Sequence, residues 1–487
     1  MRTGVLIAVI IYEFVVTVGV GLILAMRQRG AREEFLLAGR DMPAPILGIT
    51  MALTVLGTAH ILGLFENAWY LGAASIWFGI AHVLLLTIIC LTTGQWARKL
   101  EVATAPEFVE RIYDQKTRII VTCVMAAMIW GILTLETQGC GIIIAALTGW
   151  KIQHGALLGA VVGILYVLLA GMTQIGWVNL INTIVMYLGV IMAVIVLALH
   201  IPGGWGHVET FYASSADKWM LSIMGTPEVL LTFGLGVTCS VAFSQSITQN
   251  LMQPALSAKS PDTVKKALLW AAPVNGLFGV FTVAIGMAAK SLPQFAAGGP
   301  KMAAPTMIVE LLPDWATAWL LAAFLGAVLS TYAMVSLTPA TLFVKDIWVP
   351  LFKPDASEAY QANMVRVVLV VLALLALIPA ASLPPIVASI SWLFSWMVPL
   401  FWFVIFGLFW KRSVGAILGT LVISWIANCI WSFTSLPAAL HMETIPNAYI
   451  ALLVTFVVGI ILQLILPGKP GLFTRAAMDS ASPGLKA

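Results

Sequence analysis

Apolar stretches of about 20 residues or more follow one another along almost the whole chain, separated by short polar connections. A helix of that length spans the hydrocarbon core of a bilayer while satisfying its own backbone hydrogen bonds. Hydrophobic residues make up 61% of the sequence and charged residues only 9%, which leaves too few polar side chains to cover a soluble protein. The pattern predicts an all-α polytopic membrane protein.

The apolar stretches correspond to about thirteen predicted membrane spans. They cover residues 4–26, 45–71, 73–97, 118–148, 152–170, 177–200, 226–253, 265–290, 315–344, 363–381, 385–410, 414–434 and 446–466. The first stretch is too long for a signal peptide, lacks a small-residue cleavage site and is followed by charged residues, so we expect it to be retained. Residues 467–487 are predicted to form a cytoplasmic tail.

Lys and Arg are divided unevenly between the two sets of connections that alternate along the chain. One set holds twenty of the 25 basic residues, and the other holds only Arg2, Lys151, Lys218, Lys290 and Lys301. Basic connections stay on the cytoplasmic side of a membrane. We therefore expect an integral protein of the cell (inner or cytoplasmic) membrane, with its N-terminus outside and its C-terminus in the cytoplasm.

Several soluble functions find no support in the sequence. The five cysteines lie inside predicted spans without metal-ligand spacing, and we interpret them as packing residues. No phosphate-binding loop of the Walker type occurs, and no connection is long enough for an enzyme domain. The net charge of +4 is accounted for by the cytoplasmic face. We expect one membrane transporter domain over residues 1–487, with no enzymatic activity and with neither ATP nor nucleic acid as a partner.

Two predicted spans contain glycine and polar residues where a membrane helix is normally apolar. Gly57-Thr58-Ala59-His60 interrupts span 45–71, and in span 226–253 Gly234 and Gly236 precede a run of Ser, Thr and Gln residues. Taken singly, such glycines also fit closely packed helices. These two spans begin consecutive five-helix groups, residues 45–200 and 226–410. Interrupted helices at corresponding positions of two halves are typical of inverted-repeat secondary transporters, whose unwound backbone lines a midplane site.

A third span carries hydroxyl groups at bilayer depth. Ala327, Ser330 and Thr331 lie within one turn of the otherwise apolar stretch 315–344. Hydrocarbon offers a small cation no ligand, whereas hydroxyl and carbonyl oxygens that face the same way can bind it. The alternative is that both hydroxyls bond back to carbonyls of their own helix, as Ser and Thr in membrane helices often do.

Three segments resemble motifs of the sodium/solute symporter family, which contains the sodium-coupled sugar, proline and choline transporters. They are EEFLLAGRDMP before the first interrupted span, APEFVERIYD after the third span, and GLFWKRSVGAILG after the eleventh, with Gly407, Trp410, Lys411 and Gly415 in place. The resemblance extends over nearly the whole chain. It implies a leucine-transporter-type core of five plus five inverted helices, with one extra helix (4–26) before it and two (414–466) after it.

The same resemblance implies a sodium site shared between the two halves. The family's ligands on the ninth span match Ala327, Ser330 and Thr331, and its backbone ligands on the interrupted second span match Leu53 and Leu56. Three carbonyls and two hydroxyls are hard, neutral ligands that suit a monovalent ion. We expect Na⁺ as the co-transported ion, one per cycle. An aspartate of the family further along the ninth span matches Asp346.

Two positions depart from the family pattern. An aspartate associated with the exit path of the ion, at the cytoplasmic start of the sixth span, matches Asn179. A polar or acidic residue beside the ion ligands of the interrupted helix matches Val55. Both changes remove negative charge, so ion exit or a second ion site is expected to differ in this chain.

Candidate substrate-binding residues come from two arguments. Positions that contact substrate in the family match His60, His82, Ser244, Gln245 and Asn275. To these we add Glu66, Asn67, Trp130 and Glu136, since carboxylates inside a membrane are functional by default and aromatic rings beside them hold amines. Imidazoles near neutrality can donate to a carboxylate or a hydroxyl. The set favours an amine, amino acid or other zwitterion, with a carboxylate as the close alternative.

Together these observations predict sodium-coupled symport of a small organic solute by alternating access. Two alternatives remain open. Glu66, Glu136 and the histidines also fit a proton-coupled carrier of a carboxylate, and symporter-like membrane domains can serve as sensors that signal through a partner protein.

Overall fold

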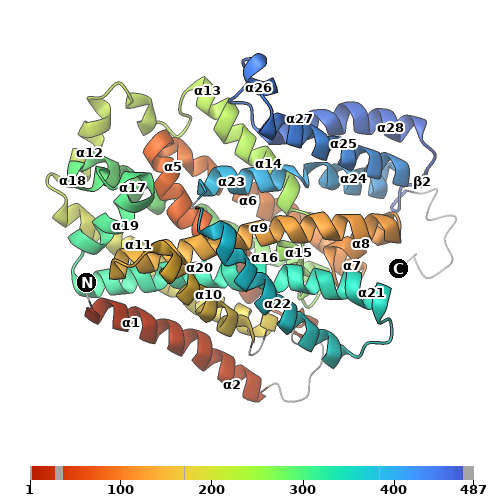
Figure 1. The fold of residues 1–487 in the computed structure, drawn as a ribbon, viewed down its shortest axis with the longest axis horizontal. Coiled ribbons are helices and arrows are strands. Elements are labelled where there is room, and N and C mark those ends of the chain that lie inside the picture. The colour runs from red at the N-terminus through yellow and green to blue at the C-terminus, as the bar shows by residue number, and fades with distance from the viewer. Residues whose placement is uncertain (1–2, 28–36, 169–170, 383, 475–487) are drawn as a thin grey trace.

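The computed structural model describes residues 3–27, 37–168, 171–382 and 384–474 (Figure 1). Within these ranges the chain is almost entirely helical. Two short strands, β1 (Lys411–Arg412) and β2 (Lys469–Pro470), pair antiparallel, with Lys411 opposite Pro470 and Arg412 opposite Lys469. This pair joins the end of α24 (Val398–Phe409) to the segment that follows α28 (Ile460–Ile465).

The first half of the chain forms the extra N-terminal helix and the first predicted five-helix group. Its elements are α1 (Thr3–Glu13), η1 (Phe14–Gly19), α2 (Val20–Arg27), η2 (Ala38–Arg40), α4 (Ala44–Val55), η3 (Ala59–Gly63), α5 (Leu64–Leu71), η4 (Gly72–Ile76), α6 (Trp77–Leu91), α7 (Thr93–Lys99), α8 (Ala105–Ile112), α9 (Gln115–Thr148), α10 (Ile152–Leu168) and α11 (Gly171–His200). A connection follows, with α12 (Gly204–Ala213) and η5 (Lys218–Leu221).

The second half of the chain contains the second predicted five-helix group and the helices that follow it. Its elements are α13 (Pro227–Val229), η6 (Leu230–Leu235), α14 (Gly236–Gln245), α15 (Gln249–Leu256), α16 (Pro261–Gly276), α17 (Phe278–Ser291), α18 (Pro293–Ala296), α19 (Gly299–Leu311), α20 (Asp314–Leu342), η7 (Phe343–Trp348), α21 (Val349–Phe352), α22 (Glu358–Ala380), α23 (Ile386–Ser395), α24, α25 (Val414–Phe433), α26 (Leu436–Ala439), α27 (Asn447–Val454), η8 (Thr455–Gly459) and α28.

Helices overlap every stretch that the sequence predicts as a span. In the described residues, eleven helices are long and apolar enough to cross a membrane, and Ala44–Val55 and Ile152–Leu168 are shorter apolar helices. The all-α membrane architecture is therefore confirmed. The number of crossings, about thirteen, stays a prediction, as does the division into the segments 4–26, 45–200, 226–410, 414–466 and 467–487.

Polar caps fix where several of the long helices begin. Asp114 accepts a hydrogen bond from the Thr117 backbone N–H at the start of α9, and Ser260 does the same for Thr263 at the start of α16. Ser413 caps α25 in the same way. Each cap satisfies a backbone donor that the helix itself leaves unpaired, which stabilises the helix by about 1 kcal/mol.

The helix α20 forms the centre of the molecule. The most apolar part of the candidate span Asp314–Phe352 is completely buried by other helices, whereas only 22% of that of α22 is buried. The neighbours α9, α10, α11 and α22 pack around α20, and it crosses the middle of the view in Figure 1. Because α20 is shielded from lipid by protein, its hydroxyl residues can serve the interior without facing hydrocarbon.

Both interrupted helices are present, and each break lies within the stretch of glycine and polar residues that predicts it. The first falls between α4 and η3, at Leu56 and Gly57. The second falls between α14 and α15, at residues 246–248 inside the polar run. Gly234 lies within η6 and Gly236 begins α14, where an added Cβ would lie 2.5 Å from the Pro446 side chain. These glycines therefore allow close packing, and the polar residues after them mark the break.

Candidate functional site

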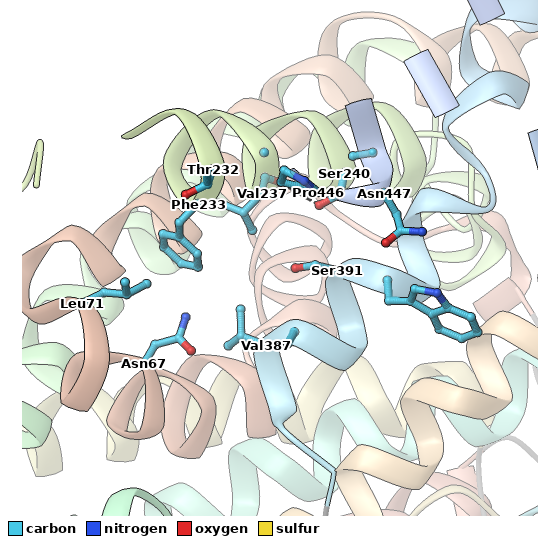
Figure 2. A pocket seen from close by; sticks show the side chains of 14 residues that line it. Asn67, Leu71, Thr232, Phe233, Val237, Ser240, Val387, Ser391, Pro446 and Asn447 are labelled. Atoms are coloured by element: carbon cyan, nitrogen blue, oxygen red, sulfur yellow. Dashed lines mark hydrogen bonds between the residues drawn. The ribbon is translucent and has the colours of Figure 1, made fainter. Parts of the chain in front are cut away.

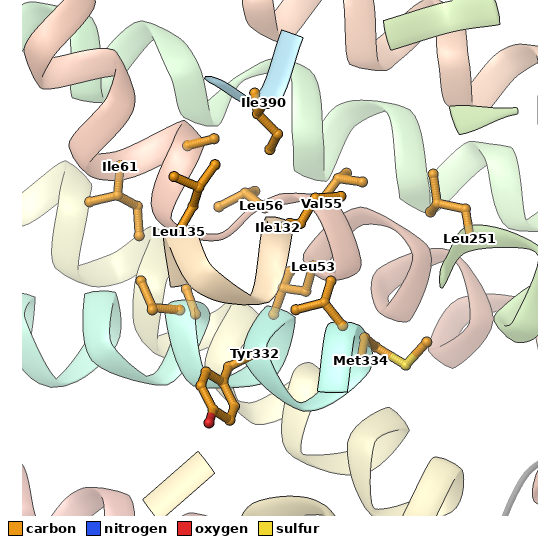
Figure 3. Packing of buried hydrophobic residues seen from close by; sticks show 14 of the residues in the cluster. Leu53, Val55, Leu56, Ile61, Ile132, Leu135, Leu251, Tyr332, Met334 and Ile390 are labelled. Atoms are coloured by element: carbon orange, nitrogen blue, oxygen red, sulfur yellow. The ribbon is translucent and has the colours of Figure 1, made fainter. Parts of the chain in front are cut away.

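The helix break at Leu56–Gly57 is crowded by side chains of two other helices. The chain leaves α4 at Leu56, which has φ −90° and ψ 57°. A Cβ on Gly57 would lie 2.6 Å from the Thr331 hydroxyl and 2.6 and 2.7 Å from the two carboxylate oxygens of Glu136. Only glycine lets the backbone come this close to α9 and α20. Apolar side chains, including Leu135 and Met334, enclose the break (Figure 3).

Four of the five predicted sodium ligands come together at this break. Thr331 Oγ1 donates to the backbone carbonyl of Leu53 at 2.7 Å, across the interface between α20 and α4. The Ala327 carbonyl accepts from Ser330 Oγ at 2.9 Å and from Thr331 Oγ1 at 3.4 Å. All four residues are buried. Leu56, the fifth predicted ligand, is the residue at which α4 ends.

The hydroxyls of Ser330 and Thr331 differ in their hydrogen-bond partners. Ser330 bonds back to a carbonyl of its own helix, as the packing alternative predicts, whereas Thr331 also reaches the interrupted helix. Hydrogen bonds link the oxygens of Leu53, Ala327, Ser330 and Thr331, and a small cation beside them could receive carbonyl and hydroxyl ligands from α4 and α20.

A central polar cluster lies beside the break, and it consists of His60, His82, Ser244, Gln245 and Asn275. The ring centroids of His60 and His82 are 4.5 Å apart. His82 Nδ1 lies 2.8 Å from the Phe78 carbonyl, which places its proton on Nδ1 and leaves Nε2 to accept from Gln245 Nε2 at 3.1 Å. Asn275 Nδ2 donates to the Ala52 carbonyl at 3.4 Å.

Several polar atoms of this cluster are buried without a well-formed hydrogen bond. They are both ring nitrogens of His60, Ser244 Oγ and Asn275 Oδ1, although Val55 and Asn275 lie near the His60 ring. Buried polar groups are normally paired, so unsatisfied ones indicate a place for a water or a ligand. The structure thus brings together His60, His82, Gln245 and Asn275, and Ser244 precedes Gln245 on α14.

The four added candidates lie in different places. Asn67 lines a cavity of about 260 Å³ between α5, η6, α14, α23 and α27, opposite Thr232 and Phe233 (Figure 2). Glu66 accepts from Lys301 Nζ at 3.1 Å and from the Ile386 backbone N–H at 3.1 Å.

The other two added candidates are on α9. The indole N–H of Trp130 donates to the Leu372 carbonyl of α22 at 3.0 Å, so this ring packs against α22 instead of joining the central polar cluster. Glu136 accepts from the Thr58 N–H at 2.9 Å and from the Thr58 hydroxyl at 2.7 Å, which places it at the helix break.

Two residues matched to family aspartates also have defined surroundings. Asn179 on α11 accepts from the Tyr166 hydroxyl at 3.1 Å, and its Nδ2 is buried without a partner. Asp346 accepts from the Thr104 hydroxyl at 2.9 Å and from Arg118 Nε at 3.0 Å. Because the Asp346 carboxylate already accepts from Arg118 on α9 and from Thr104 at the start of α8, we interpret it as a link from these helices to η7 and not as an ion ligand.

Comparison with known proteins decides the family. The profile described as Sodium:solute symporter family matches residues 35–422. This chain belongs to the sodium:solute symporter family. It is 26% identical over 409 residues to an uncharacterized symporter, YidK, of Escherichia coli (strain K12), which covers 79% of this chain and 70% of that protein. It is 24% identical over 474 residues to a sodium/glucose cotransporter of Vibrio parahaemolyticus, covering 88% and 83% of the two chains.

Solved structures confirm the fold that the family implies. A Na⁺-coupled sialic acid symporter in a substrate-bound outward-open state superposes with a TM-score of 0.79 at 18% identity, over 96% of this chain and 99% of that one. Mhp1, a nucleobase-cation-symport-1 family transporter, gives 0.55 at 13% identity, over 91% and 96%. The leucine-transporter-type fold is therefore confirmed. As a member of the sodium:solute symporter family, the protein is embedded in a membrane and uses Na⁺ as its co-transported ion.

Two residues of this family member were missed by the sequence argument. Lys301 is one of the few basic residues on the side predicted to be extracellular, and that scarcity could have singled it out as a partner for Glu66. Thr58 stands inside the predicted break, and a hydroxyl next to Gly57 could have suggested a cap for the second half of the helix.

Proposed function

We propose that the protein carries a small organic solute across the membrane together with Na⁺, by alternating access, with Leu53, Leu56, Ala327, Ser330 and Thr331 as the ion ligands. The observation that carries this proposal is the 2.7 Å contact between the Thr331 hydroxyl and the Leu53 carbonyl. An ion at that contact binds one element from each half of the chain. Its binding therefore biases the relative position of the halves, which is what coupling requires.

The central polar cluster is the proposed solute site. His60 and Ser244 offer donors, and Asn275 Oδ1 offers an acceptor, in a fully buried position. Such groups suit a carboxylate or a hydroxyl. None of the five cluster residues is acidic, and Glu66 already pairs with Lys301, so a cationic amine finds no carboxylate within the cluster. We therefore favour a solute held through its carboxylate or hydroxyl groups, including the carboxylate end of a zwitterion.

The ion supplies the driving force. Moving one positive charge inward yields about 2.3 kcal/mol for each 100 mV, and a roughly tenfold sodium gradient adds about 1.4 kcal/mol. Their sum supports accumulation of a neutral or zwitterionic solute by about 500-fold. With one ion per cycle, a membrane potential that is negative inside drives the ion and its solute inward.

Uptake into proteoliposomes tests the proposal, after a thermal-shift screen has chosen the solute. The screen uses proline, glycine betaine, choline, glucose and N-acetylneuraminic acid, each in NaCl and in KCl. We expect uptake of the selected solute to require an inward Na⁺ gradient. The double variant Ser330→Ala with Thr331→Ala should raise the Na⁺ concentration for half-maximal uptake severalfold, since two of the oxygen ligands are lost.

Ser336→Ala is the matched control, because Ser336 lies buried on the same helix and bonds only to the Ala333 carbonyl. It should leave the Na⁺ requirement unchanged. Equal Na⁺ dependence in the double variant and the control would place the ion elsewhere. Uptake that follows a pH gradient in Na⁺-free buffer would instead support proton coupling, and solute binding without any flux would support the sensor alternative.

A further inference from the structure

Glu136 is a buried carboxylate that reaches the helix break from α9. Only 2% of its surface is exposed. One carboxylate oxygen accepts from both the N–H and the hydroxyl of Thr58, at 2.9 and 2.7 Å. These bonds anchor the start of the second half of the interrupted helix to α9.

Within the described residues, no ion pair includes Glu136. Two neutral donors do not balance a full negative charge in a buried place, and an uncompensated buried charge is strongly destabilising. Val55 and Asn179 stand at positions where the family pattern has a polar or acidic residue and an aspartate, and both are neutral. Such a carboxylate is balanced either by a proton or by a cation that is not part of the chain, and the oxygen atoms that border it favour the cation.

The place for that cation is fixed by the geometry around Gly57. The Thr331 hydroxyl and both oxygens of Glu136 lie within 2.7 Å of one point, the position that a Cβ on Gly57 would occupy. Thr331 is at the same time 2.7 Å from the Leu53 carbonyl. The carboxylate of α9 thus borders the same small region as the neutral oxygens of α4 and α20.

We propose that Glu136 is the anionic member of the sodium site, with its carboxylate balancing the charge of the bound Na⁺. This inference rests on the proposed function, because it assigns a further residue to the same ion site. It also moves Glu136 out of the set of substrate-binding candidates. A carboxylate oxygen is a hard ligand that suits Na⁺, as do the carbonyl and hydroxyl oxygens beside it.

The proposal changes which half of the transport cycle responds to voltage. With Glu136 ionised, the occupied site is neutral and the empty site carries one negative charge. One positive charge still moves inward per cycle, but the membrane potential acts on the return of the empty carrier instead of on the loaded one. In a pocket of neutral oxygens alone, the loaded carrier would respond.

Direct Na⁺ binding by the purified full-length protein tests the proposal. NaCl replaces KCl at constant total salt without added solute, and the unfolding temperature is followed at each Na⁺ concentration. We expect Glu136→Gln to raise the apparent Na⁺ dissociation constant at least about tenfold, because an ionic ligand becomes a neutral one. Glu136→Asp, which keeps the charge on a shorter side chain, should recover part of that loss.

The response to Na⁺ separates this role from a purely structural one. If Glu136 only anchored Thr58, the amide oxygen of Glu136→Gln would still accept the bonds from Thr58, and the variant would keep the full Na⁺-induced increase in unfolding temperature. We expect instead an unchanged or higher unfolding temperature in KCl and a diminished response to Na⁺.

Thr331→Ala distinguishes failure of this inference from failure of the proposed function. If Thr331→Ala weakens Na⁺ binding while Glu136→Gln binds as tightly as the unchanged protein, the ion site stands and the role of Glu136 is overturned. If the unchanged protein shows no response to Na⁺ at all, the proposed function itself fails.

Discussion

Glu66 and Glu136 are both buried glutamates at the second half of the interrupted helix, but only the charge of Glu66 is paired with a basic side chain. Glu66 lies on α5 itself, and its carboxylate pairs with Lys301 Nζ at 3.1 Å and accepts a hydrogen bond from the Ile386 N–H at 3.1 Å. Glu136 reaches the start of that half from α9 and, among the described residues, accepts hydrogen bonds from the N–H and the hydroxyl of Thr58 alone. One carboxylate is balanced by the chain, and the other is left for a cation.

The segment from Thr58 to Glu66 is therefore held in two different ways at its two ends. Lys301 also donates to the Pro384 carbonyl at 3.0 Å, so the Glu66–Lys301 pair ties α5 to α19 and to the start of α23. That end is held by groups of the chain alone. The end at Gly57 is held by a carboxylate whose charge is balanced only when an ion is bound, which makes its position depend on Na⁺. An ion can therefore control one end of the segment while the other end stays attached.

The largest effect is expected from Gly57→Ala, which acts on the end that depends on Na⁺. Its Cβ would meet Thr331 and both oxygens of Glu136 at 2.6 to 2.7 Å, so those side chains must move away from the ion. Overpacking of this kind costs about 1–3 kcal/mol, which corresponds to roughly a 5- to 150-fold weaker apparent affinity for Na⁺. A Na⁺ titration of unfolding temperature and of uptake measures it.

Gly206→Ala is the control for that substitution, because an added Cβ at this position in α12 has no atom within 4 Å. It should leave the Na⁺ titration unchanged. If Gly57→Ala behaved like Gly206→Ala, the region beside Gly57 would be able to expand without disturbing the ion, and the contrast between the two glutamates would lose its basis.

Most of the fold could be predicted from the sequence, because membrane spans are set by local composition. Apolar length, the interruption at Gly57 and the family motifs need no knowledge of distant contacts. The second break lies in the polar run that follows Gly234 and Gly236, and not at the glycines themselves. Gly236 packs against Pro446, the residue before α27, and sequence periodicity does not contain such a contact.

The candidate site was predictable only in part, because sequence motifs identify single residues and do not contain their distant contacts. Thr331 and Leu53 come together as the family motif implies, and so do the residues of the central polar cluster. The partners of Glu66, Glu136 and Trp130 were not predicted, since each depends on which of several neighbouring helices its side chain meets. Lys301 and Leu372 are far from them in sequence.

A smaller effect is expected from Lys301→Met, which acts on the end held by the chain. It leaves the Glu66 carboxylate, a side chain that is 8% exposed, with the Ile386 N–H as its remaining partner among those described above. Losing one partner of a buried pair costs about 1–3 kcal/mol. We expect a lower unfolding temperature in both KCl and NaCl, and an unchanged Na⁺-induced increase. Loss of that increase would show that the two ends do not act separately.

The smallest effect is expected from Glu66→Gln, and its comparison with Glu136→Gln is the most direct test of the contrast. The amide oxygen at residue 66 can still accept from the Ile386 N–H, and the Lys301 side chain, already 22% exposed, can turn its ammonium group to water. The pair is partly solvated, so its net contribution is small, about 0–1 kcal/mol. The same chemical change should therefore alter the unfolding temperature only slightly at Glu66 and abolish most of the Na⁺ response at Glu136. Equal losses of Na⁺ response in the two variants would mean that both carboxylates belong to one electrostatic unit, and that the charge of the ion is shared along the whole of α5.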